Sequence, residues 1–192
     1  MAQAKSTELR LIRHAPALAD GRMAGHRDVP ADCTDTVALA ALRARIGPVA
    51  RCVTSPAQRC RDTYTALWPD MPAPPSDARL WEQHFGAWEG MPYAAIPDLG
   101  ALSGEALAQM RPPGGESFAD LCARVRPALA ALVEGAGPIA VVAHAGTIRA
   151  ALALALGAPA AGLAFAVAPL SLTCVTHVPG HGWSIGVVNW TV

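Results

Sequence analysis

The stretch Ile-Ala-Val-Val-Ala-His-Ala-Gly, residues 139–146, decides the fold class. Its first five residues form a continuous apolar run, which is typical of a strand buried on both faces of a parallel sheet. A helical pattern follows over residues 147–156, and Gly157 ends it. A buried strand that leads into a helix is the repeating unit of an α/β protein, and it leaves His144 at the carboxyl end of the strand.

The same alternation continues towards the N-terminus. Residues 9–13 and 52–54 are short apolar strands, and residues 36–45 form a helix for which Asp35 is the expected N-cap. Residues 117–133 have the apolar spacing of a longer helix. The pattern predicts an α/β three-layer sandwich, in which helices flank a mostly parallel central sheet.

A further helix start is signalled by Ser-Pro-Ala-Gln at residues 55–58. A serine followed by proline and, three residues on, by glutamine has the form of a capping box with proline at the first helical position. We therefore expect Ser55 to cap a helix that carries Arg59 in its first turn.

The C-terminal part has two features. Residues 150–170 carry no charge, but Gly157 and Pro159 are among the residues that interrupt them, so we expect a buried helix and a turn, with a membrane span as the weaker alternative. Beyond this stretch, residues 172–177 and 184–190 flank a Pro-Gly-His-Gly turn and predict a closing hairpin.

Composition restricts the class of protein. With 192 residues, 52% of them hydrophobic, the chain can bury one sizeable core, so we expect a single domain over residues 1–192. Formal net charge is zero and the basic residues are scattered, which predicts a small-molecule partner, with no nucleic acid and no membrane. The five cysteines include no C-x-x-C pair, and no apolar leader precedes the first strand; both features favour a cytoplasmic location.

Polar side chains follow three of the expected strands. They are Arg13 and His14, residues 55–59, and residues 144–146. Because parallel strands end at one edge of a sheet, two histidines and two arginines should meet there. Arginine gives planar bidentate contacts to phosphate, and a neutral imidazole attacks phosphorus when its other nitrogen is held by a hydrogen bond. This combination predicts a phosphoryl-transfer site.

Other chemistries lack their residues. Lys5 is the only lysine, which leaves no lysine inside the fold for a P-loop or a pyridoxal phosphate Schiff base. No H-E-x-x-H motif or Cys/His cluster accompanies the histidines, so we expect neither a metal site nor a cofactor.

Five ordered blocks resemble the histidine phosphatase superfamily, which includes cofactor-dependent phosphoglycerate mutases and α-ribazole phosphatases. They cover most of the chain, and are Leu-Ile-Arg-His at 11–14, Ser-Pro-Ala-Gln-Arg at 55–59, Leu-Trp-Glu-Gln-His-Phe-Gly-Ala-Trp-Glu-Gly at 80–90, Pro-Gly-Gly-Glu-Ser-Phe at 113–118 and Val-Val-Ala-His-Ala-Gly at 141–146. The resemblance implies one phosphoglycerate mutase-like histidine phosphatase domain.

The resemblance also implies roles for individual residues. His14 would be the phosphorylated nucleophile, and Glu82 would protonate the departing alcohol and then activate water. Arg13, Arg59 and His144 would bind the phosphoryl group, with Ala145 at the start of the following helix as a further phosphate ligand. Two more glutamates, Glu89 and Glu116, are rival candidates for the acid.

The loop after the first strand departs from the family pattern. Relatives have glycine directly after the nucleophilic histidine, whereas this chain has Ala15 followed by Pro16, and we expect the Ala15 amide still to bind phosphate. Many relatives also have an asparagine a few residues later in this loop, whereas residues 17–20 contain none. Asp20 cannot take over its contact with phosphate, because an ionised carboxylate only accepts hydrogen bonds. Gly25 and His26 lie in a loop with which relatives contact substrate, and a plain surface loop is the alternative reading.

Three functions compete at this point. A metal-independent phosphatase acting on a small-molecule monoester, with α-ribazole 5′-phosphate as the preferred substrate, is the leading hypothesis. A phosphoglycerate mutase-type phosphoryl transfer would use the same phosphohistidine, and would need extra cations for a sugar acid, for which only Arg22 and Arg27 are available. A non-catalytic module that binds phospho-ligands is the third. A homodimer is compatible with all of them.

Overall fold

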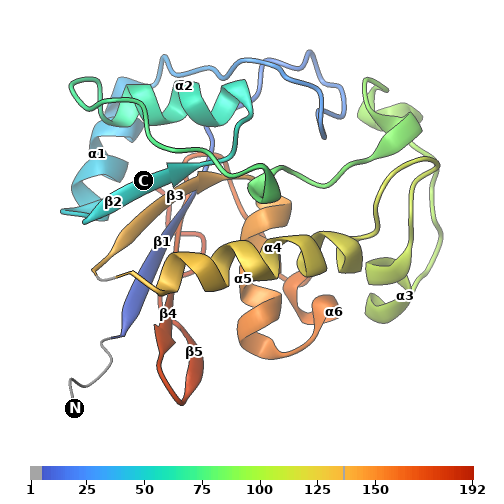
Figure 1. Ribbon diagram of the computed structural model, residues 1–192. Coiled ribbons are helices and arrows are strands. Elements are labelled where there is room, and N and C mark those ends of the chain that lie inside the picture. Colours follow the sequence, from blue (N-terminus) through green and yellow to red (C-terminus); the bar gives the residue numbers. More distant parts are fainter. Residues whose placement is uncertain (1–5, 136) are drawn as a thin grey trace.

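A five-stranded sheet forms the centre of the molecule, as seen in a computed structural model that describes residues 6–135 and 137–192 (Figure 1). The strand order is β2-β3-β1-β4-β5. Strands β2, β3 and β1 are parallel, and β4 and β5 add an antiparallel hairpin at one edge. The bounds are β1 (Thr7–Arg13), β2 (Arg51–Thr54), β3 (Ile139–Ala143), β4 (Leu172–Val178) and β5 (Gly182–Ile185).

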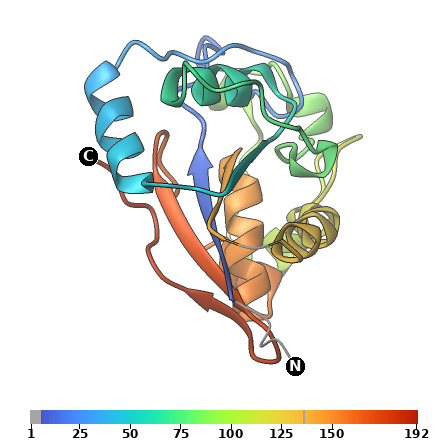
Figure 2. The same ribbon diagram turned by 60° about the vertical axis from the view of Figure 1, so that its left-hand side comes forward.

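Helices cover both faces of this sheet, so the predicted three-layer α/β architecture is confirmed (Figure 2). The α-helices are α1 (Thr36–Ile46), α2 (Gln58–Leu67), α3 (Gly104–Gln109), α4 (Phe118–Val133), α5 (Ala145–Leu156) and α6 (Pro159–Gly162). Short 3-10 helices are η1 (Ala78–Leu80), η2 (Gly86–Trp88) and η3 (Tyr93–Ala95). The first two α-helices cover one face, and α4 and α5 cover the other.

The apolar run of β3 explains why this strand lies in the middle of the sheet's parallel part. Successive side chains of a strand point to opposite faces. Val141 accordingly packs in the core beneath α4 and α5, while Val142 packs beneath α1 and α2. Both side chains are fully buried. If apolar and polar residues alternated along β3, one of the two cores would contain polar side chains.

Helix α2 starts later than the capping-box pattern predicts. Its first residue is Gln58, and its N-cap, Ala57, has no side chain that could cap it. The Gln58 amide donates instead to Asp28 Oδ1 at 2.6 Å, so a carboxylate from a distant loop takes the capping role. Ser55 is not the N-cap: its hydroxyl lies 2.8 Å from a ring nitrogen of His144 and accepts the Ala57 amide at 3.4 Å, one residue before the helix begins.

Helices α4 and α5 agree closely with expectation. Ser117 caps α4 in a reciprocal capping box with Asp120. Helix α5 starts two residues earlier than predicted, directly after β3, and Gly157 ends it in the left-handed conformation at φ 78°. In the described part of the chain, none of the helices combines the length and the apolar character needed to span a bilayer.

The C-terminal hairpin is shorter than predicted. Strand β5 ends at Ile185, although the Gly186 amide and the Val187 carbonyl still bond to Cys174 at 2.9 and 2.8 Å, and the chain then leaves the ladder over residues 188 and 189. It returns at Trp190, which exchanges two backbone hydrogen bonds of 2.9 Å with Leu172. Asn189 has a positive φ of 51°, which bends the chain back at that point.

Candidate active site

The carboxyl ends of β1, β2 and β3 meet at one edge of the sheet. The His14 amide donates to the carbonyl of Ala143 at 3.0 Å, and the Ser55 amide donates to Val142 at 2.9 Å, so the three strand ends are joined directly. A cavity of about 130 Å³ opens beside them. Its lining includes Arg13, His14, Gly25, Arg59 and Glu82, all of which we predicted from the sequence.

His14 is held in the tautomer that a nucleophile requires. Its Nδ1 lies 2.6 Å from the Ala15 carbonyl oxygen. A carbonyl only accepts hydrogen bonds, so Nδ1 carries the proton and Nε2 keeps its lone pair. The ring is buried, and burial, together with the charges of Arg59 and Arg13, lowers the pKa of His14 to about 3. The imidazole is therefore neutral at physiological pH.

The two arginines present buried donors at this edge. Arg13 Nη1 donates to the Val167 carbonyl at 2.5 Å, while Arg59 Nη1 and Nη2 donate to the carbonyls of Arg27 and Gly25 at 3.0 and 2.8 Å. Among the described residues, neither Nε has a hydrogen-bond partner, although both atoms are buried. Buried donors are nearly always paired, so these two N–H groups fit an anionic ligand in the cavity.

His144 stands behind His14 and does not line the cavity. The two rings meet edge to face with centroids 5.2 Å apart, and His144 is fully buried. Its Nε2 is 2.8 Å from the Ser55 hydroxyl, and Trp81 stacks parallel to its ring with centroids 6.1 Å apart. Burial, followed by the charge of Arg59, lowers its pKa well below the ordinary histidine value.

Glu82 reaches the site from the loop after η1. Its Oε1 accepts hydrogen bonds from the amides of Gln83 and Gly146 at 2.9 and 3.0 Å, whereas Oε2 is 3.4 Å from the Gly146 amide. Helix α5 thus holds the carboxylate with its first turn. A Cβ on Gly146 would lie 2.2 Å from Glu82 Oε1, so only glycine leaves room for this arrangement.

The two rival glutamates organise loops instead. Glu89 Oε1 accepts the amides of His26 and Phe85, each at 2.9 Å. Glu116 accepts the His84 amide at 3.0 Å and forms an ion pair with Arg124. Neither carboxylate lines the cavity, which leaves Glu82 as the carboxylate positioned for proton transfer.

The remaining predicted ligands occupy different positions. Gly25 lines the cavity, but His26 points away and its Nε2 lies 2.8 Å from the Glu82 carbonyl oxygen. Partial burial lowers the pKa of His26. Ala145 begins α5 and is not part of the lining.

The expected phosphate contact of the Ala15 amide is not formed. This amide donates to the hydroxyl of Thr63 on α2 at 2.8 Å, so it is already paired. The Thr63 hydroxyl in turn donates to the Arg59 carbonyl at 2.7 Å. The prediction is corrected: Ala15 contributes its carbonyl, which orients His14, and its amide fixes the loop to α2.

Sequence reasoning missed several residues of the site. Ser55 was interpreted as a helix cap, although a hydroxyl at a strand end beside the expected rim was a usable signal. Phe85 lies within a quoted motif, and its aromatic side chain lines the cavity. Met23 in an irregular loop and Tyr93 at the start of η3 also line it, but neither stretch has a periodicity that indicates which way these side chains face.

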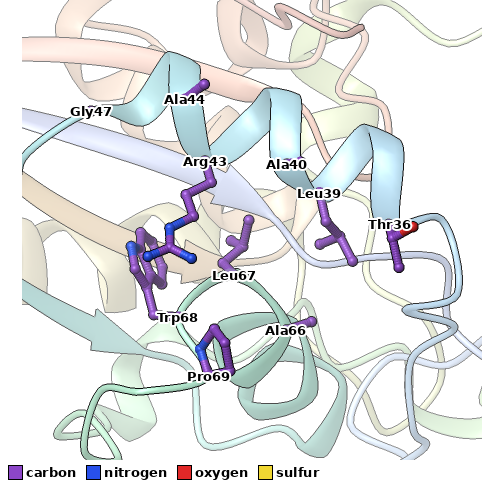
Figure 3. Close-up of a pocket in the computed structure, with 10 residues that line it drawn as sticks. All are labelled: Thr36, Leu39, Ala40, Arg43, Ala44, Gly47, Ala66, Leu67, Trp68 and Pro69. Carbon is purple, nitrogen blue, oxygen red and sulfur yellow. The ribbon is translucent and has the colours of Figure 1, made fainter.

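A larger cavity, of about 630 Å³, lies away from this site between α1 and α2 (Figure 3). In Figure 3, Arg43 extends from α1 towards Trp68, and Leu39 and Leu67 face the same space. Apart from Arg43, the side chains that line it are apolar or a single hydroxyl, so they offer neither a nucleophile nor an acid. Cavity size alone does not identify the site here.

Comparison with known proteins agrees with the geometry at the strand ends. A family model described as the histidine phosphatase superfamily, branch 1, matches residues 9–191. The chain belongs to the histidine phosphatase superfamily. This match includes the sheet except the first two residues of β1, both helical layers and every residue that lines the 130 Å³ cavity.

Curated superfamily relatives come from mycobacteria. A bifunctional protein of Mycobacterium tuberculosis is 34% identical over 171 residues, which are 82% of this chain and 46% of that protein. The chain therefore spans about half the length of the first relatives it matches. A glucosyl-3-phosphoglycerate phosphatase of Mycolicibacterium vanbaalenii is 36% identical, with 78% of this chain and 74% of that protein covered.

Solved superfamily structures share the fold over almost the full chain. A structure titled mycobacterial hydrolase 1 has a TM-score of 0.84 and 28% identity, and covers 98% of this chain and 100% of its own. A mycobacterial glucosyl-3-phosphoglycerate phosphatase in complex with VO3 has a TM-score of 0.81 and 31% identity, with 96% and 99% covered.

Proposed function

We propose that this chain is a phosphatase that hydrolyses small-molecule phosphate monoesters through a phosphohistidine at His14. The hydrogen bond between His14 Nδ1 and the Ala15 carbonyl carries the proposal, because it leaves the Nε2 lone pair free in a cavity that Arg13 and Arg59 also line. The names of the mycobacterial relatives support hydrolysis as the reaction type.

In the first half of the reaction, His14 Nε2 attacks phosphorus and the bond from phosphorus to the ester oxygen breaks. A proton on Glu82 Oε2 passes to that oxygen, so a neutral alcohol leaves. Arg13 and Arg59 stabilise the charge on the transferred phosphoryl oxygens through their unpaired Nε donors. His144, whose Nε2 lies 2.8 Å from the Ser55 hydroxyl, packs edge to face against the His14 ring and does not line the cavity, so its role in the proposed reaction is to orient His14.

In the second half, water attacks the phosphorus of phospho-His14. Glu82, now a carboxylate, takes a proton from that water, and the nitrogen–phosphorus bond breaks. Inorganic phosphate leaves and His14 returns to its neutral form. The cationic groups needed in both halves are arginines, so we propose that no metal ion takes part.

Labelling of the protein tests the nucleophile. A phosphate ester carrying ³²P should label the wild-type chain with a linkage that survives alkali and is lost in acid, as expected of phosphohistidine. His14→Ala should abolish the label, whereas His181→Ala, which removes an exposed histidine of the hairpin turn, should keep it. Label that persists in His14→Ala, or activity that needs an added divalent ion after EDTA, would contradict the proposal.

The mutase alternative is disfavoured by the cation arrangement. Arg22 and Arg27 were the candidates for holding a sugar acid, but neither lines the cavity. Arg22 Nη1 instead donates to the Gly90 carbonyl at 2.9 Å. We therefore propose that water, and not a retained sugar acid, accepts the phosphoryl group. Rapid interconversion of 3- and 2-phosphoglycerate with little phosphate released would contradict this.

Two esters deserve assay as physiological substrates. One is α-ribazole 5′-phosphate, which the sequence blocks favoured, and the other is glucosyl-3-phosphoglycerate, for which the mycobacterial relatives are named. They differ in the alcohol that leaves: the first carries an aromatic base, the second a carboxylate. The walls of the cavity bear on this difference.

A further inference from the structure

The cavity beside the phosphate-binding arginines has an apolar wall. It is formed by Ala17, Met23, Ala24, Phe85 and Tyr93, which come from the loop after β1 and from residues 85–93. Tyr93 is 59% exposed, so its ring lies at the cavity mouth. We infer that this wall binds the leaving alcohol, and that it selects monoesters of uncharged alcohols with an aromatic or apolar body over monoesters that carry a carboxylate. The inference rests on the proposed function and specifies its substrate class.

Charge at the site opposes a second anionic group on the substrate. Three of the four Nη groups, Nη1 of Arg13 and both of Arg59, are bound to backbone carbonyls, and we assign the buried Nε donors to the phosphoryl group. The carboxyl group on the cavity lining is that of Glu82, and in its ionised form it repels a neighbouring carboxylate of the substrate. A carboxylate near the ester would leave water without gaining a partner, which is unfavourable.

Other arginines are directed elsewhere. Arg22 is bound to Gly90, and Arg27 is exposed outside the cavity. Arg149 is close enough to lower the pKa of Arg13, although burial is the larger cause. Its Nε donates to the Phe165 carbonyl at 2.8 Å, and it does not line the cavity. A carboxylate-bearing ester would have to draw one of these side chains away from its present contact.

The wall is preformed by backbone pairing between its two loops. Met23 exchanges 2.9 Å hydrogen bonds with Met91 and Gly90, and the Tyr93 amide donates to the Gly21 carbonyl at 3.2 Å. Pairing of this kind fixes the loops before a ligand arrives, so little ordering is needed on binding.

Phe85 is fixed by a second set of contacts. Its amide donates to Glu89, and Gly86 follows it at φ 53°. A Cβ at residue 86 would lie 2.2 Å from the Pro113 carbonyl oxygen. The backbone at Phe85 is therefore fixed, which restricts where its ring can lie on the wall, as an aromatic recognition element requires.

A binding experiment with phosphonates tests the inference separately from turnover. The compounds 3-phenylpropylphosphonate and 4-phosphonobutanoate have the same three-carbon spacer, end in a phenyl ring or a carboxylate, and contain no ester bond to cleave. Calorimetry on the wild-type protein should give at least tenfold tighter binding of the phenyl compound. Equal affinities, or tighter binding of the carboxylate compound, would overturn the inference.

Variants of the wall identify where the preference arises. Tyr93→Ala alters an exposed side chain, and should lower the preference for the phenyl compound over the carboxylate compound at least threefold. Leu99→Ala, a matched change of a half-exposed apolar residue that does not line the cavity, should have no effect. A preference that persists at full strength in Tyr93→Ala and Phe85→Ala would overturn the assignment of the wall.

Hydrolysis of p-nitrophenyl phosphate, measured in parallel, separates the two proposals. If the protein binds the phenyl phosphonate selectively but hydrolyses no ester, the phosphatase proposal is contradicted and the assignment of the apolar wall is supported. If it hydrolyses p-nitrophenyl phosphate but binds 4-phosphonobutanoate more tightly, the assignment of the apolar wall is contradicted and the phosphatase proposal is supported.

Discussion

Arg59 shows how much one residue does at this site. It is 1% exposed, its two Nη groups hold the carbonyls of Gly25 and Arg27, and its Nε is a buried donor with no partner among the described residues. The guanidinium also lies over the Trp81 ring at 5.8 Å. Lysine has no equivalent of this planar set of donors, so Arg59→Lys is not a conservative change here.

Glu82 is the residue whose proposed role is most directly testable. Glu82→Gln cannot protonate a leaving alcohol, so hydrolysis of alkyl phosphates should slow by on the order of 10²-fold or more. The reaction of p-nitrophenyl phosphate should slow much less, because p-nitrophenolate leaves without a proton. Steady-state rates for both esters check this, with Glu89→Gln as the matched variant. Equal losses on both esters in Glu82→Gln would indicate a positioning role.

His14 predicts a pH dependence of stability. Its pKa is about 3 in the folded protein, whereas an unfolded histidine titrates near ~6.5. Between these values the unfolded chain binds more protons, so the stabilisation is complete above pH ~6.5 and is lost as pH falls towards 3. At pH 5 this one residue accounts for up to about 2 kcal/mol of lost stability.

Urea unfolding at pH 7 and pH 5 measures that loss. His14→Gln has no group that titrates in this range, so its stability should fall less than that of the wild-type protein over the same interval. His144 is shifted in the same direction and remains in the variant, so part of the pH dependence should persist. An identical pH dependence in both proteins would contradict a neutral, buried His14.

At the scale of elements, the start of α5 connects the sheet to the proposed acid. Strand β3 passes directly into the helix through His144, and the second helical amide holds Glu82. Gly146 is required by the close approach of the Glu82 side chain and not by its own backbone conformation. A Cβ added at this position would lie 2.2 Å from Glu82 Oε1 and 2.8 Å from Leu121 Cδ2.

Gly146→Ala should therefore displace Glu82. We expect the rate with alkyl phosphates to fall at least tenfold, in the direction of Glu82→Gln, and the double variant to be little worse than Glu82→Gln alone. Gly104→Ala at the start of α3 is the control, since its added Cβ would meet Ala160 at an ordinary 3.5 Å. Full activity in Gly146→Ala, or fully additive losses in the double variant, would contradict the coupling.

At the scale of the whole molecule, the site joins parts that are distant in the chain. Strand ends near residues 13, 55 and 144 meet loops near residues 25 and 82, and the two helical layers lie on either side of the sheet that carries them. A ligand that contacts all of these segments binds the folded chain and not the unfolded one, so it must stabilise the domain as a unit.

Vanadate should raise the melting temperature accordingly. At one hundred times its Kd, an added stabilisation of about 2.7 kcal/mol is expected, which corresponds to roughly 5–10 °C for a domain of this size. Thermal unfolding followed by circular dichroism measures the shift. Arg59→Met should lose this shift. Arg61→Met, which changes an exposed residue two positions further along α2, should retain it. An active wild-type protein with no shift would contradict the phosphate site.

The sequence was sufficient for the fold and for the residues at strand ends. Apolar runs locate β1, β2 and β3, and residues that follow a parallel strand must lie at one edge, so His14, Arg59 and the position of His144 could be derived. Caps were less predictable, since Ser55 could bond either to its own helix or to a neighbouring ring. The wall residues could not be predicted, because loops 17–28 and 85–93 have no periodic pattern and their pairing is set by long-range contacts.

The separation between strand ends and loop wall has an evolutionary consequence. Residues of the phosphoryl pocket are tied to one another, to the sheet and to α5, so a change in any of them disturbs several contacts at once. Met23 and Tyr93 project from surface loops, and their side chains are free to vary while those loops keep their backbone pairing. Homologous proteins can therefore acquire new substrates through substitutions at a few wall positions while the phosphoryl-transfer chemistry is inherited unchanged. A mutant library confined to residues 23, 85 and 93 is the most direct way to change the substrate preference of this protein.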